Sequence, residues 1–445
     1  MAVDSGDTAW VLGAAALVLF MTPGLALFYG GLVRSKNVLG TMMQSFGAIA
    51  IVSVVWLLAG YSLAFGPDVG GVIGGLGHLG FLGVGSAPPP LAPSVPETAF
   101  ASFQLMFAVI TPALIAGAFA ERVRFGGYVA FVAMWSLLVY APLAHWVWGG
   151  GFLGADGVGA LDFAGGTVVH ISAGAAALAA ALFVGKRRGY PRGNFAPHNV
   201  PMVVLGAGIL WFGFNAGSAL GADGLASSAF LATHLGAAGA MIGWLVPERI
   251  RHGKATAVGG ATGAVAGLVA ITPAAGFVTP LAAMAIGLAG GLVCFAAVEL
   301  KSRLGYDDSL DAVGVHMVGG LVGALLTGVF ASLAINPAGA DGGVAQLGRQ
   351  AAASIITLAF SFLATLAILA VVDRFVGFRV TAEAEDDGVD VAEHGESAYA
   401  FREHGREGVP PIAAMSDTEL EELRERLVLE ATRRVLDAVA RSGTS

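Results

Sequence analysis

Two segments of the sequence place a histidine inside a long apolar run, an unusual position for an ionisable side chain. The first, LDFAGGTVVHISAG, carries Asp162 at its start and His170 about two turns later. The second, LDAVGVHMVGG, also begins with a Leu-Asp pair and contains His316. A neutral imidazole has one donor and one acceptor nitrogen, and its pKa lies near neutrality. Two such rings can therefore share a hydrogen bond, pass a neutral amine or relay a proton.

Each histidine also has a simpler interpretation as a core residue whose ring is hydrogen-bonded to a carbonyl of a neighbouring helix. For one isolated histidine this structural interpretation is favoured. Two histidines at equivalent positions of similar segments favour function instead, because an ionisable side chain within an apolar span marks a functional site by default. His145 and His234 lack this pairing and keep the structural interpretation, and the other histidines fall in loops or in the tail.

The composition assigns these apolar runs to a membrane. Of the 445 residues, 56% are hydrophobic and only 12% are charged, about half the charged fraction of a soluble globular chain. The 66 glycines fit this class, because helices that pack in lipid need small contact residues. The net charge of −8 comes largely from acidic residues near the C-terminus and gives no argument for nucleic acid. No cleavable signal peptide is predicted, and the single Cys294 excludes an internal disulfide.

Eleven apolar stretches are long enough to cross about 30 Å of hydrocarbon. They are predicted at 8–33, 38–66, 98–120, 125–148, 163–185, 199–219, 225–246, 256–276, 279–300, 310–333 and 350–373. Lys and Arg gather in alternate connections between these stretches. The positive-inside rule therefore places the N-terminus outside and the C-terminus inside, as an odd number of spans requires. The connection 67–97 is rich in Gly and Pro and is predicted to be a surface loop on the outer side.

The order of the spans suggests a repeat. Five helices per half would insert the second half of the chain upside down relative to the first. The two histidine segments fall in the fifth and tenth spans, and the triplet Ile-Thr-Pro occurs in the third and the eighth. We therefore predict an all-α membrane protein with a 5+5 inverted repeat plus one extra helix, as in many transporters. Each histidine lies roughly 10 Å from one end of its span, so the two rings are predicted to meet near the middle of the membrane.

Several longer motifs occur in an order that resembles one known family. The sequence contains FAVITPALIAGAFAER, HWVWGGG, LDFAGGTVVH, WFGFNAGSA and GVHMVGG, together with the eleven predicted spans. Over about residues 1–400 it resembles the ammonium transporter family of Amt, Mep and Rh proteins, and within that family the Amt branch. The resemblance implies a homotrimer in a prokaryotic cytoplasmic membrane, with one conduction path in each subunit.

The resemblance also implies the residues of a pore. His170 and His316 correspond to twin histidines that line it, and Phe107 and Phe214 correspond to a stacked aromatic pair that blocks its outer end. The ammonium ion is then expected to lose its proton at or before the histidine pair and to cross the apolar pore as ammonia. The sequence is compatible with two fates of that proton: it stays outside, or it follows through the histidines and makes transport electrogenic.

The outer ammonium-binding site implied by the resemblance consists of Trp148, Ser218 and Phe107. Aromatic faces offer a small cation about 0.5–2 kcal/mol each, and the hydroxyl can accept an N–H bond. From the sequence alone, Trp148 also suits an aromatic belt at the membrane interface. Asp162 corresponds to a carboxylate that supports this site, and its position also fits a helix N-cap. Because Asp162 and His170 are separated by about 12 Å along the axis, we expect them to act at different depths.

The C-terminal part of the chain is expected to be cytoplasmic and regulatory. We divide the sequence into a transmembrane domain at 1–380, a regulatory segment at 381–400 and an extension at 401–445. The middle segment resembles the region that contacts neighbouring subunits in the family, where a trimeric PII signal protein blocks many bacterial and archaeal members. Residues 416–440 combine a capping box with an apolar stripe at helical spacing, which predicts an amphipathic helix. That helix either lies on the protein's own face or forms a trimeric coil or a docking helix.

The favoured function is a channel-like ammonium transporter, which is not an enzyme and has no cofactor or metal ion. The alternative is an ammonium sensor that signals through its tail, although the tail carries no kinase or cyclase domain. Passage of another small neutral gas such as carbon dioxide is a third option, which the aromatic residues of the outer site disfavour. No P-loop motif for ATP hydrolysis is present in the sequence.

Overall fold

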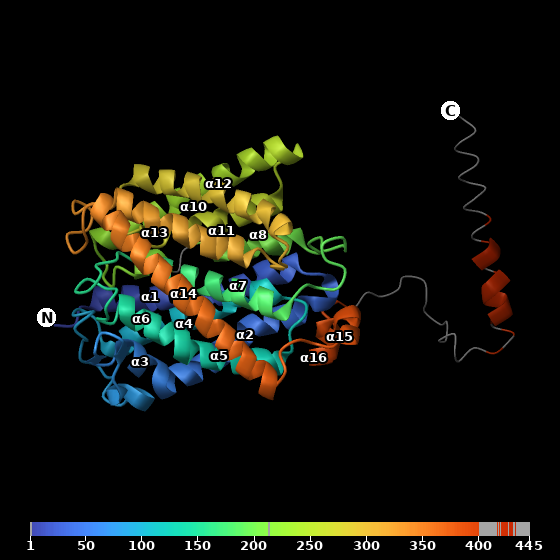
Figure 1. Ribbon diagram of the computed structural model, residues 1–445, viewed down its shortest axis with the longest axis horizontal. Helices are drawn as coiled ribbons and strands as arrows, with labels where there is room; N and C mark the ends of the chain where they lie inside the picture. The colour runs from blue at the N-terminus through green and yellow to red at the C-terminus, as the bar shows by residue number, and fades with distance from the viewer. Residues whose placement is uncertain are drawn as a thin grey trace. The chain divides into compact units, whose positions relative to one another are not determined.

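The structure is a computed structural model in which two units can be distinguished, one up to Ala398 and one from Tyr399 onward. It describes residues 2–211, 214–399, 416, 418, 420–425, 427–429 and 432. Helices make up most of the first unit and pack side by side as a bundle (Figure 1). In the second unit the described residues 418, 420–425, 427–429 and 432 are helical and Ser416 is not, and the rest of the predicted helix 416–440 lies outside the described residues.

Eleven helical segments of the first unit correspond to the eleven predicted spans. Their elements are α1 (Ser5–Leu32); α2 (Val38–Val55) with η2 (Trp56–Gly60) and α3 (Tyr61–Phe65); α4 (Glu97–Phe119); α5 (Phe125–Trp135) with η4 (Ser136–Tyr140) and α6 (Ala141–Val147); η5 (Gly166–Ile171) with α7 (Ser172–Val184); α8 (Val200–Ile209) with α9 (Phe214–Gly217); α10 (Gly224–His252); α11 (Ala257–Ile271); α12 (Pro280–Leu304); η6 (Val313–Met317) with α13 (Val318–Phe330); and α14 (Val344–Phe375). Among the described residues, ten of these segments have the length and apolar character of a membrane span, and α11 is shorter at 15 residues. The predicted number of helices is confirmed.

The distribution of apolar side chains is that of a multi-pass membrane protein. The central helices α4, α7 and α11 are almost entirely buried. Exposed leucine, isoleucine and valine side chains lie along α2, α10, α12 and α14. Figure 1 shows α14 running diagonally across one side of the bundle, where it packs against α5 and α7. An outer surface of this kind suits lipid hydrocarbon, in which each helix satisfies its own backbone hydrogen bonds.

Of the helix ends that differ from the prediction, two have a clear local reason. α11 ends at Ile271, before the predicted 276, because Pro273 follows and has no N–H to continue the hydrogen-bond ladder. α10 continues past the predicted 246 to His252 and ends at Gly253, whose φ of 78° is the left-handed conformation favoured at helix C-termini. Neither difference changes the path of the chain.

The two histidine helices pack against each other reciprocally. α7 contacts η6, and α13 contacts η5. Gly174 lies four residues after His170, and a Cβ atom there would come 2.2 Å from the backbone nitrogen of Met317. Gly320 lies four residues after His316, and a Cβ atom there would come 3.0 Å from the Cγ1 atom of Ile171. Each glycine thus abuts the residue that follows the other histidine, which is the arrangement that an inverted repeat requires.

The connection 67–97 is an ordered loop. It begins with the antiparallel strands β1 (Asp68–Val69) and β2 (Ile73–Gly74), followed by the helical turn η3 (Leu76–Phe81). The buried ring of His145 anchors it through Nδ1, 3.0 Å from the carbonyl oxygen of Ala64, and through Nε2, 2.8 Å from Asp68 Oδ1. These contacts agree with a structural role for His145.

The segment after α14 forms two short helices, α15 (Ala382–Asp387) and α16 (Val389–His394), which pack against the α2 end of the bundle. Figure 1 shows them at the end opposite to the start of α1. Glu385 accepts hydrogen bonds from the backbone of Arg188 and the guanidinium of Arg379, and Asp390 accepts one from the backbone of Gly40 at 2.8 Å. Residues 381–397 therefore pack on their own chain, while the predicted domain limits at 380 and 400 stay a prediction.

Candidate functional site

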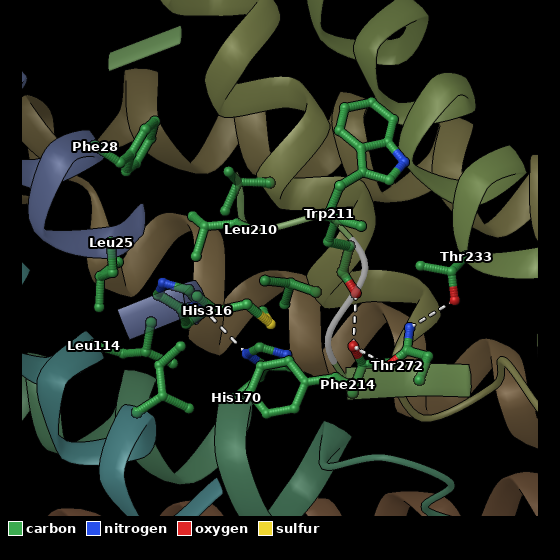
Figure 2. Close-up of a pocket in the computed structure, with 16 residues that line it drawn as sticks. Leu25, Phe28, Leu114, His170, Leu210, Trp211, Phe214, Thr233, Thr272 and His316 are labelled. Atoms are coloured by element: carbon green, nitrogen blue, oxygen red, sulfur yellow. Dashed lines mark hydrogen bonds between the residues drawn. The ribbon is translucent and has the colours of Figure 1, made fainter. Parts of the chain in front are cut away.

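His170 and His316 lie edge to edge in the centre of the bundle, with their Nδ1 atoms turned toward each other. Their Nδ1 atoms are 3.3 Å apart, and their rings are nearly parallel, with centroids 5.4 Å apart and an interplanar angle of 9°. Figure 2 shows this contact at the wall of a cavity. The cavity measures about 40 Å³, and both rings line it among apolar side chains such as Leu25, Leu114 and Leu210. The structure thus brings together the two histidines that the sequence singles out.

The geometry of this pair fixes which nitrogen atoms remain for a passing molecule. A hydrogen bond between two Nδ1 atoms requires that one neutral ring carries its proton on Nδ1 and the other carries it on Nε2. The first ring then has an unprotonated Nε2, which accepts a hydrogen bond. The second ring has an Nε2–H, which donates one. The pair can therefore act on a small amine both as acceptor and as donor.

Asp162 shapes the turn that carries His170. Its Oδ1 atom accepts the backbone N–H groups of Gly165 and Gly166 at 2.7 and 2.6 Å. Its Oδ2 atom accepts the N–H of Thr167 at 2.8 Å and that of Val168 at 3.2 Å, and also the hydroxyl of Thr167. Both carboxylate oxygens are thus committed to the start of η5, which is a helix cap with an unusually large number of bonds. Asp162 supports the site without touching His170, as the separation in sequence predicts.

The second histidine segment has its own capping carboxylate, which is Asp308. Asp308 precedes His316 by eight residues, the same distance that separates Asp162 from His170, and it accepts the N–H groups of Ala312 and Val313 at 3.1 and 2.8 Å. The two Leu-Asp pairs of the sequence suggest Asp311 for this position, but its carboxylate pairs instead with Lys301 at 2.5 Å. Burial, opposed by Lys301, raises the pKa of Asp308 to about 6.

A wider cavity of about 260 Å³ lies at the other side of Phe107, and we call it the outer vestibule. Trp148, Ser218 and Phe107, which the resemblance assigns to the outer site, all line it. Phe107 and Trp148 meet edge to face, with ring centroids 5.9 Å apart and an angle of 84°. The Ser218 hydroxyl donates to the carbonyl oxygen of Phe214 at 3.0 Å, so its oxygen remains available as an acceptor.

The indole of Trp148 is held in place by the chain segment that carries the cap. Its Nε1–H donates to the carbonyl oxygen of Asp162 at 2.9 Å. Because the carboxylate of the same residue organises η5, Asp162 links the wall of the vestibule to the turn that carries His170. Asp162 therefore contacts the vestibule wall through its main chain and the histidine turn through its side chain.

Phe107 and Phe214 separate the vestibule from the histidine cavity. Their ring centroids are 4.4 Å apart, and the rings are tilted by 58°, whereas the resemblance predicts a stacked pair. A tilted contact is a favourable arrangement for two aromatic quadrupoles. Phe214 also meets the ring of His170 at 6.4 Å and 79°, so it closes the histidine cavity on that side.

Sequence reasoning missed two groups of polar residues at the site. Gln104 lies one turn from Phe107 on α4 and lines the vestibule. Asn215 lies beside the histidine cavity, where its amide donates to Thr233 and accepts from Thr272 at 3.0 and 3.2 Å. The sequence could have indicated both, because Gln104 lies three residues before Phe107 and Asn215 directly follows Phe214.

Comparisons with known proteins place this geometry in one class. A model of the Ammonium Transporter Family matches residues 9–399. The ammonium transporter of Mycobacterium tuberculosis is 50% identical over an alignment of 452 positions, which covers 93% of this chain and 94% of the relative. The ammonium transporter of Bacillus subtilis is 51% identical over 405 residues, which cover 89% of this chain and 99% of the relative.

Solved structures show the same fold. The crystal structure of Saccharomyces cerevisiae Mep2 has a TM-score of 0.82 at 38% identity and covers 92% of this chain and 94% of that one. A solved Sensor Amt Protein has a TM-score of 0.80 at 32% identity, with 87% and 98% covered. The fold and these relatives thus define a multi-pass membrane protein of the transporter class. The chain belongs to the Ammonium Transporter Family.

Proposed function

We propose that the protein binds the ammonium ion in the outer vestibule and conducts ammonia through a pore lined by His170 and His316. One observation carries the proposal: the paired rings line a cavity of only about 40 Å³, directly behind the aromatic contact that ends a vestibule of about 260 Å³. The wide cavity suits a cation with part of its water shell. The narrow cavity suits a small dehydrated molecule.

The vestibule offers what a small cation with N–H donors needs. Taking such an ion out of water is costly unless its charge and its donors find partners. The faces of Trp148 and Phe107 attract the charge, and the oxygen of Ser218 accepts one N–H. The carbonyl oxygen of Asp162 holds the indole of Trp148, and its carboxylate holds the start of η5 and adds negative potential nearby.

Beyond Phe107 and Phe214 the path is apolar. The charge of a molecule therefore decides whether it can pass. The leucine and valine side chains of the histidine cavity give an ion no replacement for its hydration shell, whereas neutral ammonia loses little free energy when it leaves water. The imidazole pair supplies one acceptor and one donor nitrogen to ammonia and can also carry a proton. A potassium ion has no proton to lose, so deprotonation would select ammonium over potassium.

The charges around the bundle support an orientation and a compartment. Arg34, Arg122, Arg187 and Arg379 lie in connections at the end that carries α15 and α16, and the start of α1 lies at the opposite end (Figure 1). By the positive-inside rule, the tail is cytoplasmic and the N-terminus is outside a prokaryotic cytoplasmic membrane. The exposed apolar faces of the outer helices suit lipid and the neighbouring copies of a homotrimer. A PII signal protein is the expected partner at the tail side.

An ammonium sensor is the second candidate, because the solved structure named Sensor Amt Protein shares the fold. The two functions differ in flux. A transporter moves ammonia or ammonium across the bilayer, whereas a sensor needs only to bind it and change its tail.

Proteoliposomes with the purified protein test the proposal. After an ammonium jump, membrane current and internal pH are recorded, together with uptake of methylammonium in the presence of potassium. We expect flux for the wild type, with current if the proton follows and with internal alkalinisation alone if it does not. His170→Ala should change uptake or its selectivity over potassium. Binding without flux would favour the sensor, and unchanged uptake in His170→Ala would contradict the role of the pair.

A further inference from the structure

A second side chain that carries an oxygen atom, that of Gln104, lines the outer vestibule. Among the described side chains that line this cavity, only Gln104 and Ser218 carry an oxygen atom, and the others are Phe65, Leu91, Phe100, Phe103, Phe107, Val147, Trp148, Phe163 and Leu220. Gln104 is 8% exposed and therefore more than nine-tenths buried. Its Oε1 atom has no hydrogen-bond partner within the part of the chain that the structure describes.

The position of Gln104 on its helix directs it to the cavity. Phe100 and Phe107 lie four residues before it and three residues after it on α4, so the three side chains share one face of the helix. All three line the vestibule. Phe107 in turn contacts Trp148, which places the amide in the same cavity as the aromatic residues of the outer site.

A buried amide oxygen without a donor is unfavourable, and the cost is removed when a donor arrives. An ammonium ion brings four N–H groups into the vestibule. The oxygen of Ser218 can accept a hydrogen bond from one of these N–H groups, and two more can point at the aromatic faces of Trp148 and Phe107. A fourth acceptor is still needed, because an N–H group that lost its water without a replacement would weaken binding. The amide of Gln104 can supply this acceptor when rotation about its last bond exchanges its oxygen and nitrogen positions and turns the buried oxygen toward the cavity.

We infer that Gln104 is a direct ligand of the ammonium ion in the outer vestibule and sets the preference for ammonium over its methylated analogues. The inference rests on the proposed function and adds a specificity residue to it. A methyl group in place of the N–H that faces Gln104 cannot donate to the amide. A site built to hydrogen-bond an N–H group therefore discriminates against the analogue that lacks it.

Two substitutions remove the acceptor while keeping the size of the side chain, Gln104→Leu and Gln104→Met. In proteoliposomes, the half-saturating ammonium concentration should rise about tenfold in each, the effect of losing one hydrogen bond to a charged group. The preference for ammonium over methylammonium should fall by a similar factor, because the apolar side chain accommodates the methyl group. Maximal flux should change less than the half-saturating concentration.

Two further variants separate binding from folding. Gln104→Glu keeps an oxygen acceptor and should retain a half-saturating concentration within about threefold of the wild type. Gln44→Leu removes another buried glutamine whose Oε1 atom has no partner among the described residues, but Gln44 lies on α2 beside α16. This variant should leave the preference for ammonium unchanged, although it also removes a buried amide.

The outcomes distinguish this inference from the proposed function. If the wild type moves no ammonium, the proposed function fails. If the wild type moves ammonium and Ser218→Ala weakens binding, but Gln104→Leu and Gln104→Met keep the wild-type preference over methylammonium, only the role of Gln104 is overturned. A loss of maximal flux in these variants at an unchanged half-saturating concentration would also overturn it, since that result describes a structural residue.

Discussion

Residues 162–174 and 308–320 build the same local device twice. In each segment an aspartate caps a π-helical turn, a histidine follows eight residues after the aspartate, and a glycine follows four residues after the histidine. The surroundings of the two caps differ. Through its carbonyl oxygen, Asp162 holds Trp148 in the wall of an aromatic vestibule whose described lining residues carry no charge. Asp308 lies beside Lys301 and Asp311 and next to Asp307, which pairs with Arg187.

The difference shows which parts of the repeat were free to diverge. The two rings must meet in the centre, so the spacing from cap to histidine to glycine is the same in both halves. The residues outside the cap contact only one side of the membrane and can take on separate tasks. One end holds an aromatic cavity for a cation, and the other end holds a charged cluster on which the C-terminal segment packs through Arg188 and Glu385.

The largest expected effect tests the charged cluster of the second half. The buried guanidinium of Arg187 pairs with Asp307 at 2.8 Å and with Glu121 at 2.9 Å. Arg187→Ala should lower the free energy of unfolding in detergent by about 3–5 kcal/mol, because it leaves the buried Asp307 with only Arg122, 4.0 Å away, and takes from the buried Glu121 one of its two cations. Arg188→Ala removes a neighbouring but exposed pair with Asp386 and should cost about 0.5 kcal/mol or less. An equal loss of unfolding free energy in the two variants would mean that burial does not determine how much an ion pair of this cluster contributes to stability.

The next effect tests the symmetry at the centre. Gly174→Ala should cost about 3 kcal/mol, because the new Cβ atom would lie 2.2 Å from the backbone of Met317, which cannot move aside cheaply. Gly320→Ala should cost about 1 kcal/mol, because its closest neighbours are the side chains of Ile171 and His170 at 3.0 and 3.1 Å. Thermal unfolding in detergent measures both. If Gly320→Ala is the more damaging variant, the two helices are not packed as described.

The third prediction tests the cap of the second half, Asp308, through the pH dependence of stability. The folded state binds a proton on Asp308 near pH 6, whereas an unfolded aspartate binds one near 3.8. The folded state therefore holds more protons in this window, and wild-type stability should rise relative to Asp308→Asn as the pH falls from about 7 to 4. The gain should be on the order of 2 kcal/mol and should level off below the unfolded pKa. Unfolding measured across this range would contradict the raised pKa if the difference between the two proteins stayed constant.

Hydropathy and charge determined the fold class from the sequence alone. A segment that crosses hydrocarbon must be long and apolar, and positive residues mark alternate connections, so eleven spans could be placed without a structure. The motifs around His170 and His316 also indicated the pair, since an imidazole in an apolar span stands out from its neighbours. The helical limits were less certain, as the early end of α11 before Pro273 shows.

Only the tertiary structure decided how the residues meet through space. The sequence paired the two Leu-Asp motifs, but the fold assigned the second cap to Asp308, because hydrogen bonds depend on which N–H groups face the carboxylate. The tilt between Phe107 and Phe214 and the place of Gln104 in the vestibule arise from packing between distant helices. The docking of α16 on Gly40 joins residues 350 positions apart. Local pattern records burial and helical spacing, whereas contacts of this kind exist only once the helices have assembled.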